Sequence, residues 1–205
     1  MNESPFSMGA GPKPCQAPRA RIAPRRVRGV VSSQTRMNPS PIVFLGLGSN
    51  VGDREANLAR ARELLATRGF RESAASALYE TEPVGGPPQG PFLNQAIGGS
   101  DALPARALLG ACLEIEQELG RVRRERNGPR TLDLDILLYG DLVSDEPGLE
   151  LPHPRMLERR FVLAPLVEIA ANVRHPVSGA TLGELLERCP DRSHVARFQA
   201  SELPR

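Results

Sequence analysis

Residues 131–138 read Thr-Leu-Asp-Leu-Asp-Ile-Leu-Leu, and this alternation of polar and apolar side chains constrains the fold more than any other stretch of the chain. Successive side chains of a β-strand point to opposite faces of a sheet. The polar members therefore share one face and the apolar members share the other: Thr131, Asp133 and Asp135 against Leu132, Leu134, Ile136 and Leu138. The pattern predicts a half-buried strand from Thr131 to Tyr139 that carries two neighbouring carboxylates.

Apolar runs and turn residues ahead of this strand predict the rest of an α+β domain. A first strand at 42–47 ends in the turn Gly48-Ser49-Asn50, and Asp53 is suited to cap a helix that ends near Gly69. There follow a weaker strand at 70–79, a loop rich in Pro and Gly at 82–91, a strand at 92–98 and a helix at 104–119. The order β-α-β-β-α-β predicts a ferredoxin-like sandwich, in which two helices cover one face of an antiparallel sheet and the other face stays available.

Beyond Tyr139 the pattern weakens into a C-terminal extension. Short strands are predicted near Leu142 and Leu149, and helices at 159–168 and 181–186. Together with the elements before them, these segments make residues 41–205 a single predicted domain, which is an ordinary length for one hydrophobic core.

The first 40 residues differ from the rest in composition and charge. They hold seven basic side chains and one acidic one, and they are rich in Pro, Arg, Gly and Ser with little apolar periodicity. Such a segment cannot bury enough apolar surface to offset its conformational entropy, so residues 1–40 are predicted to be a disordered basic tail. A nucleic-acid contact or an organellar address are alternatives to a dispensable extension.

Cysteine usage and hydropathy indicate a cytoplasmic protein without a membrane association. The three cysteines, Cys15, Cys112 and Cys189, are far apart and lack zinc-ligand spacing, which is typical of free thiols in a reducing compartment. No apolar run approaches the roughly 20 residues that span a bilayer, and the N-terminus lacks the apolar stretch of a secretory signal.

A cationic segment lies immediately before the carboxylate pair. Five arginines, broken by Gly128-Pro129, lead directly into the acidic strand: Arg121, Arg123, Arg124, Arg126 and Arg130. Hard divalent cations such as Mg²⁺ prefer carboxylate oxygens, and guanidinium groups bind phosphate oxygens, so the combination indicates a nucleoside triphosphate. A solvated acidic face and a solvated or nucleic-acid-binding arginine loop are the alternative interpretations of the two parts. Neither a GxGxxG nor a GxxxxGK[ST] motif occurs.

Of the three histidines, His153 lies between Pro152 and Pro154 and is therefore held in a stiff segment, which makes it a candidate site residue. His175 and His194 are predicted to be surface residues.

Six segments in unbroken order carry a resemblance to a known family. They are Gly46–Asn50, Thr81–Val84, Phe92–Asn94, Glu116 with Gly120–Arg123, Gly128–Asp135 and Pro152-His153. Together they resemble the 6-hydroxymethyl-7,8-dihydropterin pyrophosphokinase family over residues 42–190, and the stretch at 128–137 is very specific to it. The first 40 residues have no counterpart in the family.

The resemblance implies an enzyme of folate biosynthesis that transfers pyrophosphate from ATP to the hydroxymethyl group of a reduced pterin and releases AMP. It implies two Mg²⁺ ions held by Asp133 and Asp135, with Arg121, Arg123 and Arg130 as further catalytic residues. The implied ATP-binding residues are Glu116, Arg121, Arg123, Arg130, Ile136, His153 and Arg159. The implied pterin-binding residues are Thr81, Glu82, Pro83, Val84, Phe92, Asn94 and Phe161, with the two phenylalanines stacking on the ring. The enzyme is expected to act as a monomer.

Two departures from the family pattern lie near the expected site. Asn127 stands where some members carry a loop tryptophan, in an arginine loop one residue shorter than in some, and Pro154 stands where some carry a tyrosine.

Two other functions compete with the one that the resemblance implies. A ferredoxin-like nucleic-acid module would need a cluster of aromatic side chains on the open sheet face, whereas acids occupy it. A nucleotidyltransferase would use the same pair of carboxylates but release pyrophosphate.

Overall fold

The computed structural model of the chain describes residues 41–101, 103–121 and 128–199. The predicted disordered tail, Arg123 and Asn127 therefore lie outside the described residues, as does Cys15.

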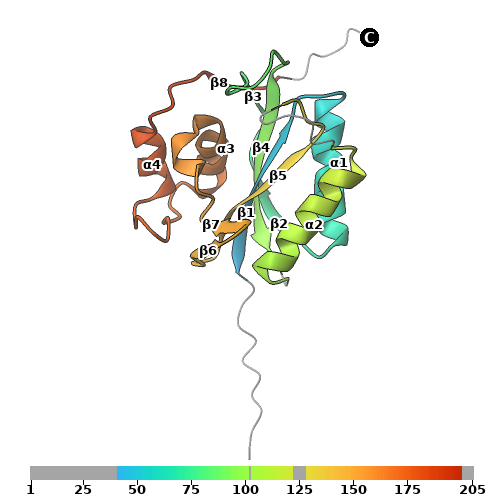
Figure 1. The fold of residues 1–205 in the computed structure, drawn as a ribbon. Coiled ribbons are helices and arrows are strands. Elements are labelled where there is room, and N and C mark those ends of the chain that lie inside the picture. The colour runs from blue at the N-terminus through green and yellow to red at the C-terminus, as the bar shows by residue number, and fades with distance from the viewer. Residues whose placement is uncertain (1–40, 102, 122–127, 200–205) are drawn as a thin grey trace, which may run out of the picture. The chain divides into compact units, whose positions relative to one another are not determined.

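A six-stranded antiparallel sheet forms the centre of the domain (Figure 1). Its strands run in the order β5-β1-β4-β3-β8, and β2 also pairs with β4. Their bounds are β1 Ile42–Ser49, β2 Arg71–Ala75, β3 Tyr79–Thr81, β4 Phe92–Ser100, β5 Asp133–Tyr139 and β8 Val195–Arg197. Strands β6 (Ser144–Glu146) and β7 (Leu149–Leu151) form a separate antiparallel pair.

Helices α1 (Arg54–Thr67) and α2 (Ala105–Glu118) cover one face of the sheet, as predicted (Figure 1). Asp53 caps α1 by accepting a hydrogen bond from the Ala56 N–H at 3.0 Å, which satisfies one of the unpaired donors of the first turn. The main core lies between these helices and the sheet, and strand β5 contributes Leu134 and Ile136 to it. The predicted mixed α+β class is therefore confirmed.

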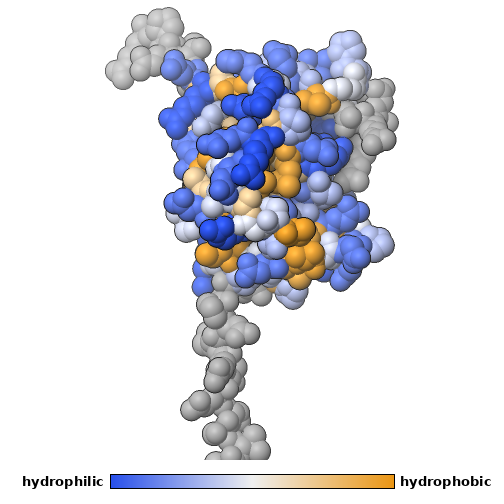
Figure 2. All heavy atoms as spheres, turned by 90° about the vertical axis from the view of Figure 1, so that its left-hand side faces the viewer, coloured by the Kyte–Doolittle hydropathy of each residue, from blue (hydrophilic) through white to orange (hydrophobic). Residues whose placement is uncertain are grey.

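The opposite face of the sheet is only partly available, whereas the prediction left it uncovered. Helices α3 (Arg160–Ala170) and α4 (Leu182–Arg188) lie on that side, after the 3₁₀ turn η1 (Met156–Glu158), as Figure 1 shows. A second core cluster joins Leu163 and Leu166 of α3 to Phe44 of β1 and Ala96 of β4. The outer surface on this side, seen in Figure 2, is mostly hydrophilic with smaller apolar groups between. The apolar side of α3 is thus buried against the sheet, which removes it from water.

Strand β5 departs from strict alternation near its end. Its pairing with β1 shifts register between Phe44 and Leu45, so that Leu137 is an extra residue in the ladder. Leu138 consequently lies opposite Phe44 and packs in the second core, on the face predicted to belong to the acidic residues. A bulge of this kind re-aims the side chains that follow it. The freed Leu137 carbonyl accepts a hydrogen bond from the His153 N–H at 3.0 Å.

The weak strand predicted at 70–79 is two strands separated at residues 76–78. Ser76 interrupts the pairing, because its backbone N–H donates to the Ala96 carbonyl while its hydroxyl accepts from the Ala96 N–H. Strand β8 was not predicted from the sequence. It extends the sheet beyond β3, and Arg197 Nη2 lies 3.0 Å from Glu168 Oε1 on α3.

Two cysteines and one histidine are buried. Cys112 and Cys189 are free and buried in the two cores, which agrees with the prediction of free thiols. His175 is only 6% exposed, so its prediction as a surface residue is wrong. Its Nδ1 accepts a hydrogen bond from the Ser178 N–H at 3.2 Å within a turn. Within the described residues, none of the helices is long and apolar enough to cross a membrane.

Candidate active site

A cleft of about 230 Å³ opens on the face of the sheet where α3 lies. Glycines of β1, polar and aromatic residues of β4, and the acidic residues of β5 form its floor: Gly46, Gly48, Phe92, Asn94, Asp133 and Asp135. The loop after β3 and the start of α3 form its walls and include Glu82, Val84, Gln89 and Phe161. Most of the residues predicted from the sequence therefore meet in one cavity.

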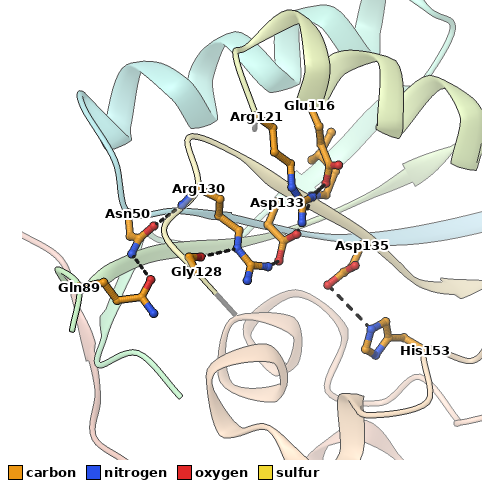
Figure 3. Close-up of polar contacts among 10 residues, drawn as sticks. Asn50, Gln89, Glu116, Arg121, Gly128, Arg130, Asp133, Asp135 and His153 are labelled. Carbon is orange, nitrogen blue, oxygen red and sulfur yellow. Dashed lines mark hydrogen bonds and ion pairs between the residues drawn. The ribbon is translucent and has the colours of Figure 1, made fainter. Parts of the chain in front are cut away.

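The two carboxylates of β5 lie on the cleft side of the strand, as the alternation predicts. Asp133 is paired with two arginines (Figure 3). Its Oδ1 lies 2.8 Å from Arg121 Nη1, and its Oδ2 lies 2.7 Å from Arg130 Nη1. A carboxylate that accepts from two guanidinium groups is held in one orientation.

Asp135 has a different environment. Among the described residues, the basic side chain that lies within 4 Å of it is His153, whose Nε2 is 3.8 Å from Oδ2 (Figure 3). Burial and then the negative charge of Asp133 raise the pKa of Asp135 to about 6, against the opposing charges of nearby arginines. Because 39% of the side chain is nevertheless exposed, the carboxylate is accessible from the cleft. Asp135 thus has no guanidinium at ion-pair distance among the described residues, although the positive charge of Arg159 acts on it from further away.

His153 is held next to Asp135 by the bulge in β5 through its backbone hydrogen bond to Leu137. Burial, followed by the positive charges of Arg159 and Arg155, lowers the pKa of His153 to about 4. The imidazole is therefore neutral at neutral pH, and one of its nitrogens carries a proton that can be donated.

Glu116 lies at the end of α2 behind the acidic strand, and its side chain is only 4% exposed. Its carboxylate accepts from the Leu134 N–H at 2.8 Å and forms an ion pair with Arg121 (Figure 3). Burial raises the pKa of this carboxyl, while the Leu134 N–H and Arg121 oppose the rise. Glu116 does not belong to the described residues that line the cleft, and it orients Arg121 from behind.

Arg130 is anchored to the end of β1 by Asn50. The Arg130 N–H donates to Asn50 Oδ1 at 2.8 Å, and the Asn50 N–H donates to the Arg130 carbonyl at 3.1 Å. The Asn50 amide also donates to Gln89 Oε1 at 2.9 Å, which ties the loop after β3 to the same point (Figure 3). The turn at 48–50 was predicted from the sequence, but the role of the Asn50 side chain was missed. The partners lie 80 residues apart, and no local pattern marks them.

Two phenylalanines line the cleft from different elements, Phe92 on β4 and Phe161 on α3. Each carries an arginine over its ring: Arg130 at 5.9 Å from the Phe92 centroid and Arg159 at 5.5 Å from that of Phe161. These distances are within the range of cation–π contacts.

The polar part of the cleft is fixed by a buried hydrogen bond in which Asn94 Nδ2 donates to Thr81 Oγ1 at 2.7 Å. The glycine at 48 leaves room for this amide, because an added Cβ would lie only 3.0 Å from Asn94 Oδ1. Of the loop residues predicted to bind substrate, Glu82 and Val84 line the cleft with Thr81, whereas Pro83 is not among the described lining residues.

A second cavity of about 240 Å³ lies on the other side of Asp135. It is lined by Ile136, His153 and Pro154 together with residues of β7 and its approach. Asp135 borders both cavities, so a ligand long enough to occupy the two would pass over this carboxylate. Pro154, one of the two departures from the family pattern, lines this second cavity.

Asp133 and Asp135 are the candidates for holding a metal. No group of three or more His, Cys, Asp or Glu side chains suited to a metal ion occurs within residues 41–101, 103–121 and 128–199. Two neighbouring carboxylates fit Mg²⁺ bound together with substrate phosphates, since this ion is usually held by one or two carboxylates, water and phosphate oxygens.

An antiparallel sheet carries helices on both faces, and acidic and arginine side chains meet beside two aromatic rings in its cleft. This arrangement is typical of an enzyme that transfers a phosphate-containing group. Comparison with known proteins identifies the family of this chain. The family model described as 7,8-dihydro-6-hydroxymethylpterin-pyrophosphokinase matches residues 44–171. The chain belongs to this family, which confirms the predicted resemblance, the pyrophosphokinase activity and its part in folate biosynthesis.

Two bacterial relatives are similar over nearly their whole lengths. The 2-amino-4-hydroxy-6-hydroxymethyldihydropteridine pyrophosphokinase of Methylorubrum extorquens is 48% identical, over 76% of this chain and 98% of the relative. The enzyme of the same name from Bacillus subtilis is 44% identical, over 78% of this chain and 98% of the relative. A crystal structure of HPPK-DHPS in complex with substrates has a TM-score of 0.58 at 12% identity, over 74% of this chain and 43% of that one. This structural likeness shows the fold alone.

Proposed function

We propose that the cleft holds the reduced pterin and the phosphates of ATP together over Asp133 and Asp135. The hydroxymethyl oxygen of the pterin attacks the β-phosphorus of ATP, the bond from that phosphorus to the oxygen of the α-phosphate breaks, and AMP leaves. The observation that best supports this proposal is the position of both carboxylates on the cleft face of β5, with Arg121 and Arg130 directed at Asp133.

Phosphate binding is assigned to the arginines that surround the acidic pair. Arg121 and Arg130 lie at Asp133, and Arg159 lines the same cleft. Guanidinium groups offer several donors in one plane, which suits the oxygens of a polyphosphate. Arg123 remains a proposed member of this set from the family resemblance, although it lies outside the described residues.

Two Mg²⁺ ions are proposed to be held by Asp133 and Asp135 with the phosphate oxygens. The position of the two carboxylates side by side on the cleft face of β5 supports this, because two neighbouring negative charges favour a bound cation between them. Bound Mg²⁺ would neutralise charge on the transferred group and so favour its transfer. The neighbouring side chains hold the proposed metal ligand in position: Arg121 and Arg130 orient Asp133, and Glu116 orients Arg121.

The pterin is proposed to stack between Phe92 and Phe161. Flat aromatic rings favour such stacking, and both side chains line the cleft. Asn94, Thr81 and the backbone of residues 81–84 would recognise the hydrogen-bonding edge of the ring. The buried hydrogen bond from Asn94 to Thr81 supports this proposal, because it fixes the orientation of the Asn94 amide.

The nucleoside of ATP is proposed to occupy the second cavity, against Ile136. The cavity borders the cleft at Asp135, so the triphosphate would run from one to the other over that carboxylate. His153, neutral at pH 7, would donate a hydrogen bond to a phosphate without adding charge.

Four further expectations stay proposals: that the strand order β5-β1-β4-β3 with α1 and α2 is a ferredoxin-like core with a C-terminal extension, that the enzyme acts as a monomer, that it is cytoplasmic, and that residues 1–40 are a disordered and dispensable tail.

One incubation tests the reaction against the nucleotidyl-transfer alternative. The purified protein is mixed with ATP, Mg²⁺ and 6-hydroxymethyl-7,8-dihydropterin, and the nucleotide products are separated by chromatography. Release of AMP in step with pterin diphosphate supports the proposal. Release of pyrophosphate with a nucleotide joined to the pterin would establish the alternative chemistry, and omission of the pterin is the control for hydrolysis.

A further inference from the structure

Arg155 lines the cleft but belongs to none of the roles described so far. It follows His153 in the turn that leads into η1, where the Arg155 N–H donates to His153 Nδ1 at 3.3 Å and the Met156 N–H donates to the His153 carbonyl at 3.1 Å. These two bonds fix the backbone of the turn, and the side chain of Arg155 is exposed at the cleft.

The arginines of the cleft fall into two groups by their partners. Arg121 and Arg130 are both paired with Asp133. Arg155 and Arg159, by contrast, form no ion pair with any carboxylate in the part of the chain that the structure describes. Arg159 has its guanidinium over the Phe161 ring, which supplies only a weak compensation for the charge.

Arg155 and Arg159 are also close enough to repel one another. Burial and then the positive charge of Arg155 lower the pKa of Arg159. The charges of Asp135 and Asp133 oppose this shift, but neither carboxylate is at ion-pair distance from the two arginines. Two cations held beside a cleft in this way favour an anion next to them. The pterin ring is uncharged, so the anionic groups of the reaction are the phosphates of the nucleotide.

We infer that Arg155 and Arg159 form a second cationic wall of the cleft, opposite the wall of Arg121 and Arg130, and that Arg155 binds a phosphate group of the nucleotide. This inference rests on the proposed binding of ATP in the cleft. Both arginines of the second wall flank η1. In the first wall, Arg121 follows the end of α2 and Arg130 precedes the start of β5. The polyphosphate is thus held from two sides, with Asp133 and Asp135 beneath it.

The test compares Arg155→Gln and Arg155→Lys with the parent full-length enzyme. Arg188→Gln is the matched control, since Arg188 is an exposed arginine on α4 that does not line the cleft. Calorimetry measures the Kd of the α,β-methylene analogue of ATP with Mg²⁺, and separately the Kd of 6-hydroxymethylpterin. Steady-state assays of AMP release give KM for ATP and kcat.

We expect Arg155→Gln to raise the Kd of the analogue about tenfold, in the range for loss of one charge-assisted hydrogen bond. Arg155→Lys should recover part of the loss, because it keeps the charge but not the planar group. Pterin affinity and the melting temperature should stay at the parent values, since the Arg155 side chain has no ion-pair partner among residues 41–101, 103–121 and 128–199. The salt dependence of analogue binding should also become shallower.

Two results would overturn the inference. One is an analogue Kd for Arg155→Gln within twofold of the parent, which would make Arg155 a solvated surface arginine. The other is an equal loss in Arg155→Gln and Arg188→Gln, which would reduce the effect to net charge. A parent enzyme that neither binds the analogue nor releases AMP would instead refute the proposed function itself, so the two failures are distinguishable.

Discussion

Arg130 Nη1 lies 2.7 Å from Asp133 Oδ2, so an arginine directly contacts a carboxylate that is also the proposed metal ligand (Figure 3). Asp135, two residues on, has no arginine within ion-pair distance among the described residues. The two acids of one strand therefore differ in what each contributes to stability, although both are proposed to hold Mg²⁺.

Substituting the two acids separately exposes this difference. We expect Asp135→Asn to fold at least as stably as the parent, because it removes a charge that Asp133 repels. Asp133→Asn should melt at a lower temperature, because it weakens the pairing of Arg121 and Arg130. Both variants should lose activity by orders of magnitude, since each removes a proposed ligand. Melting curves and AMP release across a Mg²⁺ titration measure both effects, and an active but destabilised Asp135→Asn would contradict the two-metal assignment.

Glu116 is expected to act on activity through Arg121. In Glu116→Gln the amide oxygen still accepts from the Leu134 N–H, but the ion pair with Arg121 is lost, so kcat should fall while the fold persists. Glu116→Ala should in addition destabilise the protein by about 1–3 kcal/mol, because the Leu134 N–H is left buried without that acceptor. Urea unfolding and AMP release distinguish these effects. Equal activity of Glu116→Gln and the parent would show that Arg121 does not depend on Glu116.

Two glycines of β1 offer a matched pair at the cleft. An added Cβ at Gly48 would lie 3.0 Å from Asn94 Oδ1, whereas one at Gly46 would lie 3.4 Å from a Leu137 methyl carbon. We expect Gly48→Ala to displace the Asn94 amide and weaken pterin binding by about 0.5–1.5 kcal/mol, the net value of one hydrogen bond. Gly46→Ala should change it less. Calorimetry with the pterin measures both, and a larger loss for Gly46→Ala would argue against recognition by Asn94.

Phe161 supplies one face of the proposed pterin sandwich. Phe161→Ala should weaken pterin binding by about 1–3 kcal/mol, in the range for a buried aromatic contact. Phe161→Tyr keeps a flat ring and should retain most of the affinity. ATP binding should change little in either variant, and calorimetry with each ligand makes the comparison. Loss of ATP binding with pterin binding intact would overturn the sandwich.

His175 should make stability depend on pH below neutrality. Burial lowers its pKa below the ordinary value of 6.5, and its Nδ1 is a hydrogen-bond acceptor that protonation would remove. Between the lowered folded pKa and 6.5 the unfolded chain binds more protons, so the stability contribution is present above about pH 6.5 and falls as the pH drops through this window. His175→Asn, which has no titrating group, is the control.

The difference in melting temperature between parent and His175→Asn should be constant above pH 7 and change in favour of the variant below pH 6.5. NMR of the His175 ring gives its pKa directly. A ring that titrates at or above 6.5 would contradict the expected dependence.

The sequence alone determined the features that depend on neighbours along the chain. The alternation at 131–136 put Asp133 and Asp135 on one face, Asp53 marked the start of α1, and the order of the elements predicted an α+β domain. Arg121 and Arg130 were predicted near the acids because they immediately precede them. These predictions succeeded because side-chain direction in a strand and capping in a helix are set by local backbone geometry.

Only the tertiary structure decided the features that depend on distant partners. The bulge at Leu137 follows from the pairing of β5 with β1, and it moves Leu138 to the second core and holds His153 beside Asp135. The covering of the second sheet face by α3, the addition of β8 to β3 and the anchoring of Arg130 by Asn50 likewise join residues far apart in sequence. Strand register and burial result from which surfaces meet in the folded chain, and a local sequence pattern does not specify its partner.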